Sequence, residues 1–284
     1  MIEVIVPGPL CTVQDRGRAG FAHLGIGRSG AADRRAYELA NRLVGNHGGE
    51  AALEVTFGGL QLRFDRSCLV AITGAPCRTS GHDLGDQQPV AVPAGATVAL
   101  ATPTMGMRTY LAVRGGIAIE PVLGSMSTDL LGGLGQAPLR TGDRLAIGSD
   151  PATPFPTAAA PRTPDADEPI GIWPGPRARW FDASAFEALV AAPYTVLPTS
   201  NRVGARLRGV GLDRTILREL PSEGLVEGAI QVPADGQPLI FLADHPTTGG
   251  YPVIAVVDTA HLSRVAQSRP GENLRFRWLA RPRR

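Results

Sequence analysis

Short β-like runs recur between turn signals along the first half of the chain. Such regularly spaced runs predict an antiparallel sandwich or barrel rather than alternating β–α–β units. The chain is rich in turn formers, with 35 glycines and 25 prolines, which fits many short strands. The strands expected here are Ile2–Val6, Leu53–Phe57, Leu60–Phe64, Cys68–Thr73, Pro89–Val92, Thr97–Ala101, Tyr110–Val113 and Leu145–Ile147.

One segment of this half follows a helical period instead. The run from Asp33 to Val44 places apolar residues three and four positions apart, and Gly45-Asn46 supplies a stop signal. We therefore expect one helix among the strands. The apolar positions of that helix are Ala36, Leu39, Ala40 and Leu43.

Residues 149–169 interrupt the pattern. Proline, alanine and threonine dominate this segment, which has no apolar periodicity and is typical of an exposed connector. It predicts two domains, at residues 1–150 and 170–284. The second half again suggests strands, at Ile170–Trp173, Thr195–Leu197, Ile230–Val232, Leu239–Leu242, Val253–Val257 and Leu274–Trp278, with short helices after Asp182 and after Asp258.

Arginine supplies all 28 basic residues, and the net charge is only +2. Without a concentrated basic stripe or stacking aromatics, nucleic-acid binding is not expected. The absence of lysine also rules out a biotinyl-lysine, a P-loop lysine or a Schiff base in this chain. Any biotin would have to be supplied by a partner.

The remaining composition points to a cytoplasmic, non-membrane protein. Three cysteines without a C-x-x-C pair suit reduced thiols, and no apolar run reaches the length of a membrane span. The N-terminus opens with a strand rather than a leader-like segment. The five histidines lack ligand spacing, so no metal site is expected.

Four polar, glycine-rich clusters carry the candidate chemistry. The first cluster covers residues 12–33, where Asp15 stands beside Arg16 and Arg18. These neighbouring cations would favour the ionised carboxylate. The second cluster, residues 113–128, has hydroxyls but no obvious base. A turn with a surface ion pair and a helix cap remain alternative interpretations of the first cluster, and a structural turn is the alternative for the second.

The third and fourth clusters lie in the second half. In the third, residues 200–209, Arg202, Arg206 and Arg208 could grip a carboxylate or phosphate, or could lie along a solvated strand. The fourth, residues 228–252, is the densest. Its Asp244 or His245 could act as an acid or base, and backbone N–H groups around Gly249-Gly250 could bind an anion, although a hydrogen-bonded turn is also possible.

Taken in order, these segments resemble the allophanate-hydrolase-subunit-2 family. That family includes the C subunit of bacterial ATP-dependent 5-oxoprolinase, antagonists of a kinase inhibitor, and part of the carboxyltransferase region of urea carboxylase. The sequence departs from the family pattern at Met126 and at His245-Pro246. The resemblance rests on residues 12–18, 29–33, 41–46, 114–116, 124–128, 201–204, 228–233, 247–252, 266–267 and 270–271.

The resemblance implies a mainly β protein with a few short helices, built as two cyclophilin-like β-barrel subdomains. It also implies two partners, a homologous B subunit that resembles a kinase inhibitor and a further A subunit. The active site would be shared with the B subunit, and the complex would use ATP to convert 5-oxoproline to glutamate. The alternatives are a carboxyltransferase component of a biotin-dependent urea or amide carboxylase and a non-enzymatic antagonist of a kinase inhibitor.

We expect a composite site in which Asp244 and Asp15 are catalytic. Asp244 would transfer a proton or position another group. The expected substrate-binding residues are Gln14, Arg16, Ser29, Arg202, Gln231, Thr247, Thr248, Gly249, Gly250 and Tyr251.

Overall fold

The computed structural model describes residues 1–161 and 168–280, and within them the chain folds as two compact units. Unit 1 contains Met1–Arg18 and the described residues from Ser29 to 161. Unit 2 contains Ala19–Arg28 and the described residues from 168 to 280. The segment Ala19–Arg28 therefore belongs to unit 2 although unit 1 surrounds it in sequence.

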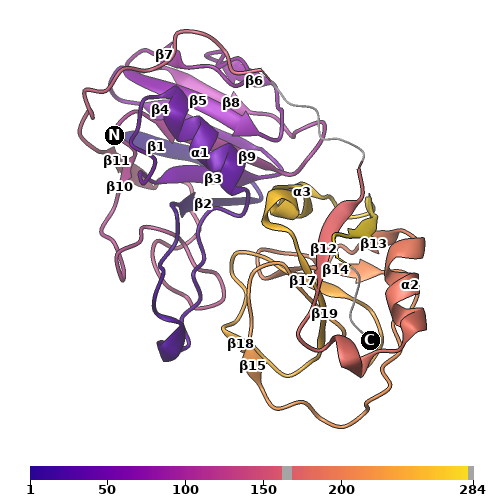
Figure 1. The fold of residues 1–284 in the computed structure, drawn as a ribbon. Coiled ribbons are helices and arrows are strands. Elements are labelled where there is room, and N and C mark those ends of the chain that lie inside the picture. Colours follow the sequence, from indigo (N-terminus) through magenta and orange to yellow (C-terminus); the bar gives the residue numbers. More distant parts are fainter. Residues whose placement is uncertain (162–167, 281–284) are drawn as a thin grey trace. The chain divides into compact units, whose positions relative to one another are not determined.

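Unit 1 is a two-sheet structure with one helix (Figure 1). One sheet has the strand order β10-β11-β1-β4-β8-β6 and the other β2-β3-β9-β5-β7, with antiparallel pairing throughout the assigned pairs. The strands are β1 (Ile2–Pro7), β2 (Leu10–Gln14), β3 (Ala52–Thr56), β4 (Leu60–Phe64), β5 (Cys68–Gly74), β6 (Thr79–Gly81), β7 (Val90–Val92), β8 (Thr97–Leu100), β9 (Arg108–Val113), β10 (Ile117–Ala118) and β11 (Arg144–Ile147).

The period-two pattern of β4 shows how these sheets bury their apolar faces. Leu60, Leu62 and Phe64 are buried, whereas Gln61 and Arg63 between them are exposed. The buried side chains join a core that both sheets share. Because successive strand residues point to opposite faces, such alternation is the signature of a sheet with one solvated face.

The second sheet is covered on its other face by α1 (Arg34–Leu43), which packs against β5 and β9 (Figure 1). The helix begins where expected, because the Asp33 side chain accepts a hydrogen bond from the Ala36 N–H at 3.0 Å. Tyr37, Ala40 and Leu43 form a second core with side chains of the sheet. All six residues of β9 are consequently buried, because the shared core covers one face of this strand and α1 covers the other.

Unit 2 is an eight-stranded sheet with the order β20-β13-β14-β17-β16-β19-β12-β21. Its strands are β12 (Ile170–Pro174), β13 (Tyr194–Val196), β14 (Gly204–Arg208), β16 (Ala229–Gln231), β17 (Leu239–Phe241), β19 (Val253–Val257), β20 (Asn273–Leu274) and β21 (Phe276–Trp278). A separate pair joins β15 (Glu223–Gly224) to β18 (Thr248–Gly249). The helical elements are η1 (Ala22–Leu24), η2 (Ala178–Trp180), α2 (Ala183–Ala191), η3 (Thr259–His261) and α3 (Leu262–Gln267).

The end of the chain closes this sheet into a barrel-like form. A single strand was expected over Leu274–Trp278, but the structure divides it at Arg275. β20 pairs with β13 at one edge of the strand order, and β21 pairs in parallel with β12 at the other. Since consecutive strands occupy both edges, the last residues of the described chain link the two ends of the sheet.

The architecture is mainly β with three short α-helices among the described residues, as expected from the sequence. Two of the predicted helices begin at the predicted caps, since Asp182 accepts from the Ala185 N–H and Asp258 from the Ala260 N–H. None of the helices in the described part is long and apolar enough to cross a membrane.

The first part of the predicted connector is tied to unit 1. The Arg114 guanidinium donates to the Asp150 carboxylate at 2.8 Å and to the Thr153 carbonyl at 2.7 Å. The Ala160 N–H donates to the Gln87 carbonyl at 2.7 Å. The remainder of the predicted connector includes residues 162–167, which lie outside the described residues.

Candidate functional sites in the two units

Asp15 holds the first and second clusters together inside unit 1. It lies at the end of β2 and is 5% exposed. Its Oδ1 accepts from the Gly17 N–H at 2.7 Å and from the Ser125 hydroxyl at 2.6 Å, and its Oδ2 accepts from the Met126 N–H at 2.7 Å. The Ser127 hydroxyl also donates to Oδ1. A buried carboxylate with this many donors is suited to holding a loop in place.

The same bonds define what the second cluster can do. The hydroxyls of Ser125 and Ser127 both donate to the Asp15 carboxylate. A carboxylate that accepts from a hydroxyl can polarise it, but here both hydroxyls are buried and turned toward an interior anion. The arrangement therefore favours a scaffold for residues 125–128.

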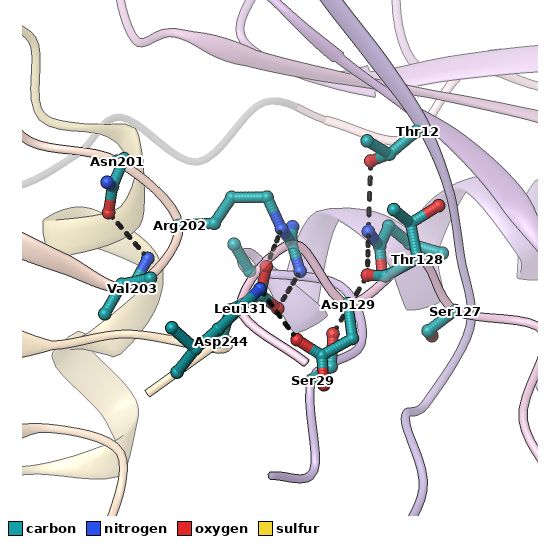
Figure 2. Close-up of polar contacts among 12 residues, drawn as sticks. Thr12, Ser29, Ser127, Thr128, Asp129, Leu131, Asn201, Arg202, Val203 and Asp244 are labelled. Atoms are coloured by element: carbon teal, nitrogen blue, oxygen red, sulfur yellow. Dashed lines mark hydrogen bonds and ion pairs between the residues drawn. The ribbon is translucent and has the colours of Figure 1, made fainter. Parts of the chain in front are cut away.

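Gln14 and Ser29 attach to the same loop through one carbonyl. Gln14 Nε2 and the Ser29 hydroxyl each donate to the Thr128 carbonyl at 3.0 Å (Figure 2). Gln14 Nε2 also donates to the Thr12 hydroxyl at 3.0 Å, while Gln14 Oε1 has no partner among the described residues. Both predicted binding side chains are completely buried, so direct substrate contact would require the loop to move.

Backbone strain marks the Ser29-Gly30 turn. Ser29 adopts a positive φ of 55°, which is uncommon for a residue with a Cβ atom. Gly30 also has a positive φ, and a Cβ there would lie 2.8 Å from the Gly17 nitrogen. The turn thus needs glycine at position 30 to approach the backbone of the first cluster.

Arg16 and Arg18, the two cations next to Asp15 in sequence, occupy different surroundings in the structure. Arg16 is exposed, with its guanidinium near Gly48. Arg18 is buried and donates to the Ser127 and Val122 carbonyls, with a guanidinium nitrogen 3.7 Å from the Asp129 carboxylate. Arg18 therefore holds the end of the second cluster and the residue that follows it, Asp129.

Two buried acidic groups of unit 1 were missed by sequence reasoning. Asp129 accepts from the Leu131 and Gly132 N–H groups at 3.0 and 2.8 Å (Figure 2). Glu54 on β3 accepts from the Tyr110 hydroxyl at 2.6 Å and the Ala32 N–H at 3.0 Å. The acidic residue inside an otherwise apolar predicted strand was the available signal for Glu54.

The Glu54 network supports the turn that carries Ser29. Burial, followed by the charge of Glu54, raises the pKa of the Tyr110 phenol well above its usual value, so the phenol remains a donor. Tyr110 in turn accepts from the Asp33 N–H at 2.7 Å. Arg108 lies 3.5 Å from the Glu54 carboxylate and compensates its charge.

In unit 2, Arg202 and Asp244 join the third and fourth clusters. Figure 2 shows the two parallel contacts, in which Arg202 Nε and one terminal nitrogen each donate to a different Asp244 oxygen at 2.9 Å. Both residues are 1% exposed, and the Asp244 N–H donates to the Arg202 carbonyl at 3.0 Å. This planar fork geometry is the strong form of an ion pair. It favours positioning over proton transfer for Asp244, because the carboxylate is committed to the guanidinium.

Arg206 and Arg208 do not join this pair. They occupy alternate positions of β14 and are exposed, while Leu207 between them and Ala205 before them are buried. These two arginines therefore lie along a solvated strand, which was one of the two alternatives expected from the sequence.

The turn after Asp244 presents polar groups at the surface of unit 2. Thr248, Gly250 and Tyr251 are exposed, with Tyr251 at 49%. Strand β18 within this turn pairs with β15, and the Leu225 N–H donates to the Thr247 carbonyl at 2.9 Å. A framed turn with exposed hydroxyls and N–H groups can contact a small polar ligand.

Gln231 fixes the far end of the same turn. Its Nε2 donates to the Tyr251 carbonyl at 2.9 Å, and the side chain is buried. A Cβ at Gly249 would lie 2.7 Å from this nitrogen, so glycine allows the close approach. At the start of the turn, His245 Nδ1 lies 2.7 Å from the Pro246 carbonyl. A Cβ at Gly27 would lie 2.9 Å from the His245 carbonyl, which places the segment Ala19–Arg28 against this part of unit 2.

The structure thus groups the predicted residues by unit. Gln14, Asp15 and Ser29 meet in unit 1, and Arg202 with the predicted residues from 231 to 251 forms the group in unit 2. Across residues 1–161 and 168–280, no group of three or more His, Cys, Asp or Glu side chains could hold a metal ion.

Comparison with known proteins identifies the family. A model described as "Carboxyltransferase domain, subdomain A and B" matches residues 24–278. The chain is 40% identical over 281 residues to the C subunit of 5-oxoprolinase from Escherichia coli, covering 97% of this chain and 90% of that protein. It is 33% identical to urea amidolyase of Saccharomyces cerevisiae, of which the match covers 16%.

Comparison with a solved structure supports the same family. The Kluyveromyces lactis urea amidolyase matches with a TM-score of 0.92 at 31% identity over 98% of this chain, which spans 19% of that chain. The sequence and fold matches thus agree along nearly the whole length, and the chain belongs to the family of carboxyltransferase domains with subdomains A and B.

Proposed function

We propose that this chain is the C subunit of an ATP-dependent 5-oxoprolinase, which opens the lactam ring of 5-oxoproline to give glutamate. The observation that carries the proposal is the 40% identity to the C subunit of a 5-oxoprolinase over 97% of this chain and 90% of the relative. Urea amidolyase, by contrast, is a much longer protein of which the chain covers less than a fifth.

The geometry supports a protein that supplies part of a shared site. In unit 1 the Ser125 and Ser127 hydroxyls are directed to Asp15, and in unit 2 Asp244 is committed to Arg202. Neither arrangement provides a free base beside a nucleophile, the pairing that covalent acyl-group chemistry requires. The exposed Thr248, Gly250 and Tyr251 instead offer groups that could contact substrate.

We assign positioning roles to the two acidic residues that were expected to be catalytic. Asp15 holds residues 125–128, and the Arg202–Asp244 pair holds the start of the turn that carries Thr247 and Thr248. Substrate would then meet the turn in unit 2, with Gln231 maintaining its shape. Gln14, Arg16 and Ser29 would contribute through the first cluster.

Partners are part of this proposal. The complex would include a homologous B subunit that completes the active site and a further A subunit, all in the cytoplasm. ATP would be consumed by the assembly, and in this lysine-free chain arginines, together with backbone N–H groups, would be the main groups to contact its phosphates. Coupling to ATP would make opening of the unstrained lactam favourable: water would supply the groups added across the broken C–N bond, and ADP and phosphate would be released.

Reconstitution tests the proposal. The chain should be co-expressed with the products of neighbouring genes, and glutamate formed from 5-oxoproline measured with and without ATP. We expect ATP-dependent glutamate only when this chain is present. If the complete complex forms and releases no glutamate, the 5-oxoprolinase assignment is wrong; tight partner binding without turnover would then favour the antagonist role.

The carboxyltransferase alternative is favoured by one specific observation, the match over 97% of this chain to a urea amidolyase. In that case a partner must carry biotin, because this chain has no lysine. Probing the purified native complex with streptavidin and assaying carboxylation of urea separates the two functions. Biotin on a partner together with ATP- and bicarbonate-dependent carboxylation would replace the first proposal.

A further inference from the structure

A cavity of about 600 Å³ lies in unit 2, lined by none of the candidate residues described above. The turn after β12, the short helix η2 and Ile216 form its walls. This volume falls in the range of small-molecule pockets. The cavity lies outside the proposed site, so a ligand bound there would differ from the substrate of that site.

The walls of this cavity are held by hydrogen bonds to the barrel. The Gly175 N–H donates to the Ile254 carbonyl at 2.8 Å, and a Cβ on Gly175 would lie 2.3 Å from the Val253 carbonyl oxygen. Next to the lining residue Ile216, the Thr215 N–H donates to the Trp180 carbonyl at 2.9 Å and the Thr215 hydroxyl does so at 3.1 Å. These contacts preform the cavity, which reduces the entropy lost when a ligand binds.

The lining is positively charged. Arg177 and Arg179 both line the cavity, and the lining contains no acidic side chain among the described residues. The charge of Arg177 is compensated by Glu223, because Arg177 Nε donates to the Glu223 carboxylate at 2.9 Å. Arg179 is exposed and makes no hydrogen bond or ion pair with the described residues. An arginine without a partner at the rim of a pocket is suited to bind a carboxylate or phosphate.

Apolar side chains line much of the cavity. Trp180, only 4% exposed, lines it together with Pro174, Pro176 and Ile216. The Arg218 guanidinium lies over the Trp180 ring, 5.7 Å from its centroid. The Trp180 indole N–H has no acceptor among the described residues. A ligand with a planar ring would therefore find apolar walls and a spare donor beside the charged rim.

We propose that this cavity binds a small organic anion with a planar apolar part. Its anionic group would lie on Arg179, and its ring would pack between Trp180 and the proline walls. This site goes beyond the proposed function and does not depend on it, because it lies within one unit and shares no residue with the proposed 5-oxoproline site.

Calorimetric titration of the full chain tests this site. The anionic probes are indole-3-acetate, a carboxylate, and AMP, a phosphate; indole-3-acetamide and adenosine are their neutral counterparts. We expect one anion or both to bind at one site per chain, and the neutral counterpart at least tenfold more weakly. Which anion binds then distinguishes a carboxylate site from a phosphate site.

Matched arginine variants locate the binding. Arg179→Gln should weaken binding by about tenfold or more, the usual loss for a charge-assisted hydrogen bond. Arg206→Gln, an exposed arginine of the same unit, should leave it unchanged. The proposal is overturned if neither anion binds at a single site, if Arg179→Gln binds like the unmodified chain, or if both variants lose affinity equally.

Discussion

Arg202 and Asp244 are both buried, and their paired contacts join the backbone before β14 to the backbone after β17. Replacing Arg202 by methionine leaves the Asp244 carboxylate in the interior without its main countercharge. Removal of one partner of a buried pair typically costs about 3–5 kcal/mol. We therefore expect Arg202→Met to lower the free energy of unfolding by about this amount, measured by urea denaturation monitored by circular dichroism.

A second substitution separates stability from function at the same pair. Because apolar pairs can replace buried ion pairs without loss, Arg202→Met combined with Asp244→Leu should recover most of the lost stability. Under the proposed function, the reconstituted complex carrying this double variant should remain at least tenfold less active. Full recovery of glutamate formation would show that the pair is only structural.

Asp15 permits a similar test in unit 1. Asp15→Asn keeps the shape of the side chain but puts an amide NH2 where the carboxylate accepts from the Met126 N–H. An interior donor left without an acceptor costs about 1–3 kcal/mol. Thermal unfolding should therefore show a clear fall in stability, whereas Asp213→Asn, at an exposed aspartate, should show none. Equal stability of the two variants would contradict the scaffold role of Asp15.

These residues also show how much of the candidate site the sequence can predict at the scale of single residues. Asp15, Arg202 and Asp244 stand out in it because charged residues interrupt glycine-rich turns. Their burial and pairing depend on contacts between segments 42 residues apart for Arg202–Asp244 and about 110 apart for Asp15. Local pattern cannot specify such contacts, which is why Asp129 and its contact with Arg18 were overlooked.

At the scale of elements, the pair β15–β18 connects the turn of the proposed site to Arg177. Glu223 on β15 lies opposite Gly249 on β18, and its carboxylate binds the Arg177 guanidinium. Arg177→Gln should therefore free β15 and speed amide hydrogen exchange in residues 247–250. The pair is partly exposed, at 39% and 28%, so the loss of global stability should stay below about 1 kcal/mol.

The neighbouring arginine provides the control for that experiment. Arg179→Gln removes a charge two residues away without breaking an ion pair to the described residues, so exchange in residues 247–250 should not change. Unchanged exchange in Arg177→Gln, or equal acceleration in both variants, would mean that the Arg177–Glu223 contact does not support the turn.

The strands that the sequence predicted well are those with apolar runs. Leu60–Phe64 and Val253–Val257 have the same bounds in the structure as in the expectation. The strand Leu10–Gln14 was missed because its buried positions include threonine and glutamine. Two-residue strands such as β15 are too short to show any period, and they exist only through their partners.

At the scale of the whole molecule, composition alone could not assign two segments to their units. Residues 150–160 are rich in proline and alanine, yet hydrogen bonds attach them to unit 1. Ala19–Arg28 is glycine-rich and lies between two parts of unit 1 in sequence, yet it packs within unit 2. In both cases the attachment depends on single polar contacts or on a missing Cβ, features that hydropathy does not register.

Arg114 is the residue on which the attachment of residues 150–160 chiefly depends. Its guanidinium donates to the carbonyls of Val44 and Thr153 at 2.9 and 2.7 Å, and it lies 5.2 Å from the centroid of the Phe155 ring. Arg114→Gln would leave at least one of these carbonyls without its donor and should lower the free energy of unfolding by about 1–2 kcal/mol.

The larger effect of that substitution should be local. With the guanidinium gone, residues 150–160 lose the hydrogen bonds that Arg114 makes to Asp150 and Thr153, and limited digestion with proteinase K should cut there several times faster, as read by intact mass. Arg66→Gln is the matched control, because Arg66 reaches the Gly148 carbonyl only at 3.5 Å. Equal cleavage of both variants would mean that packing, rather than the Arg114 guanidinium, holds this segment on unit 1.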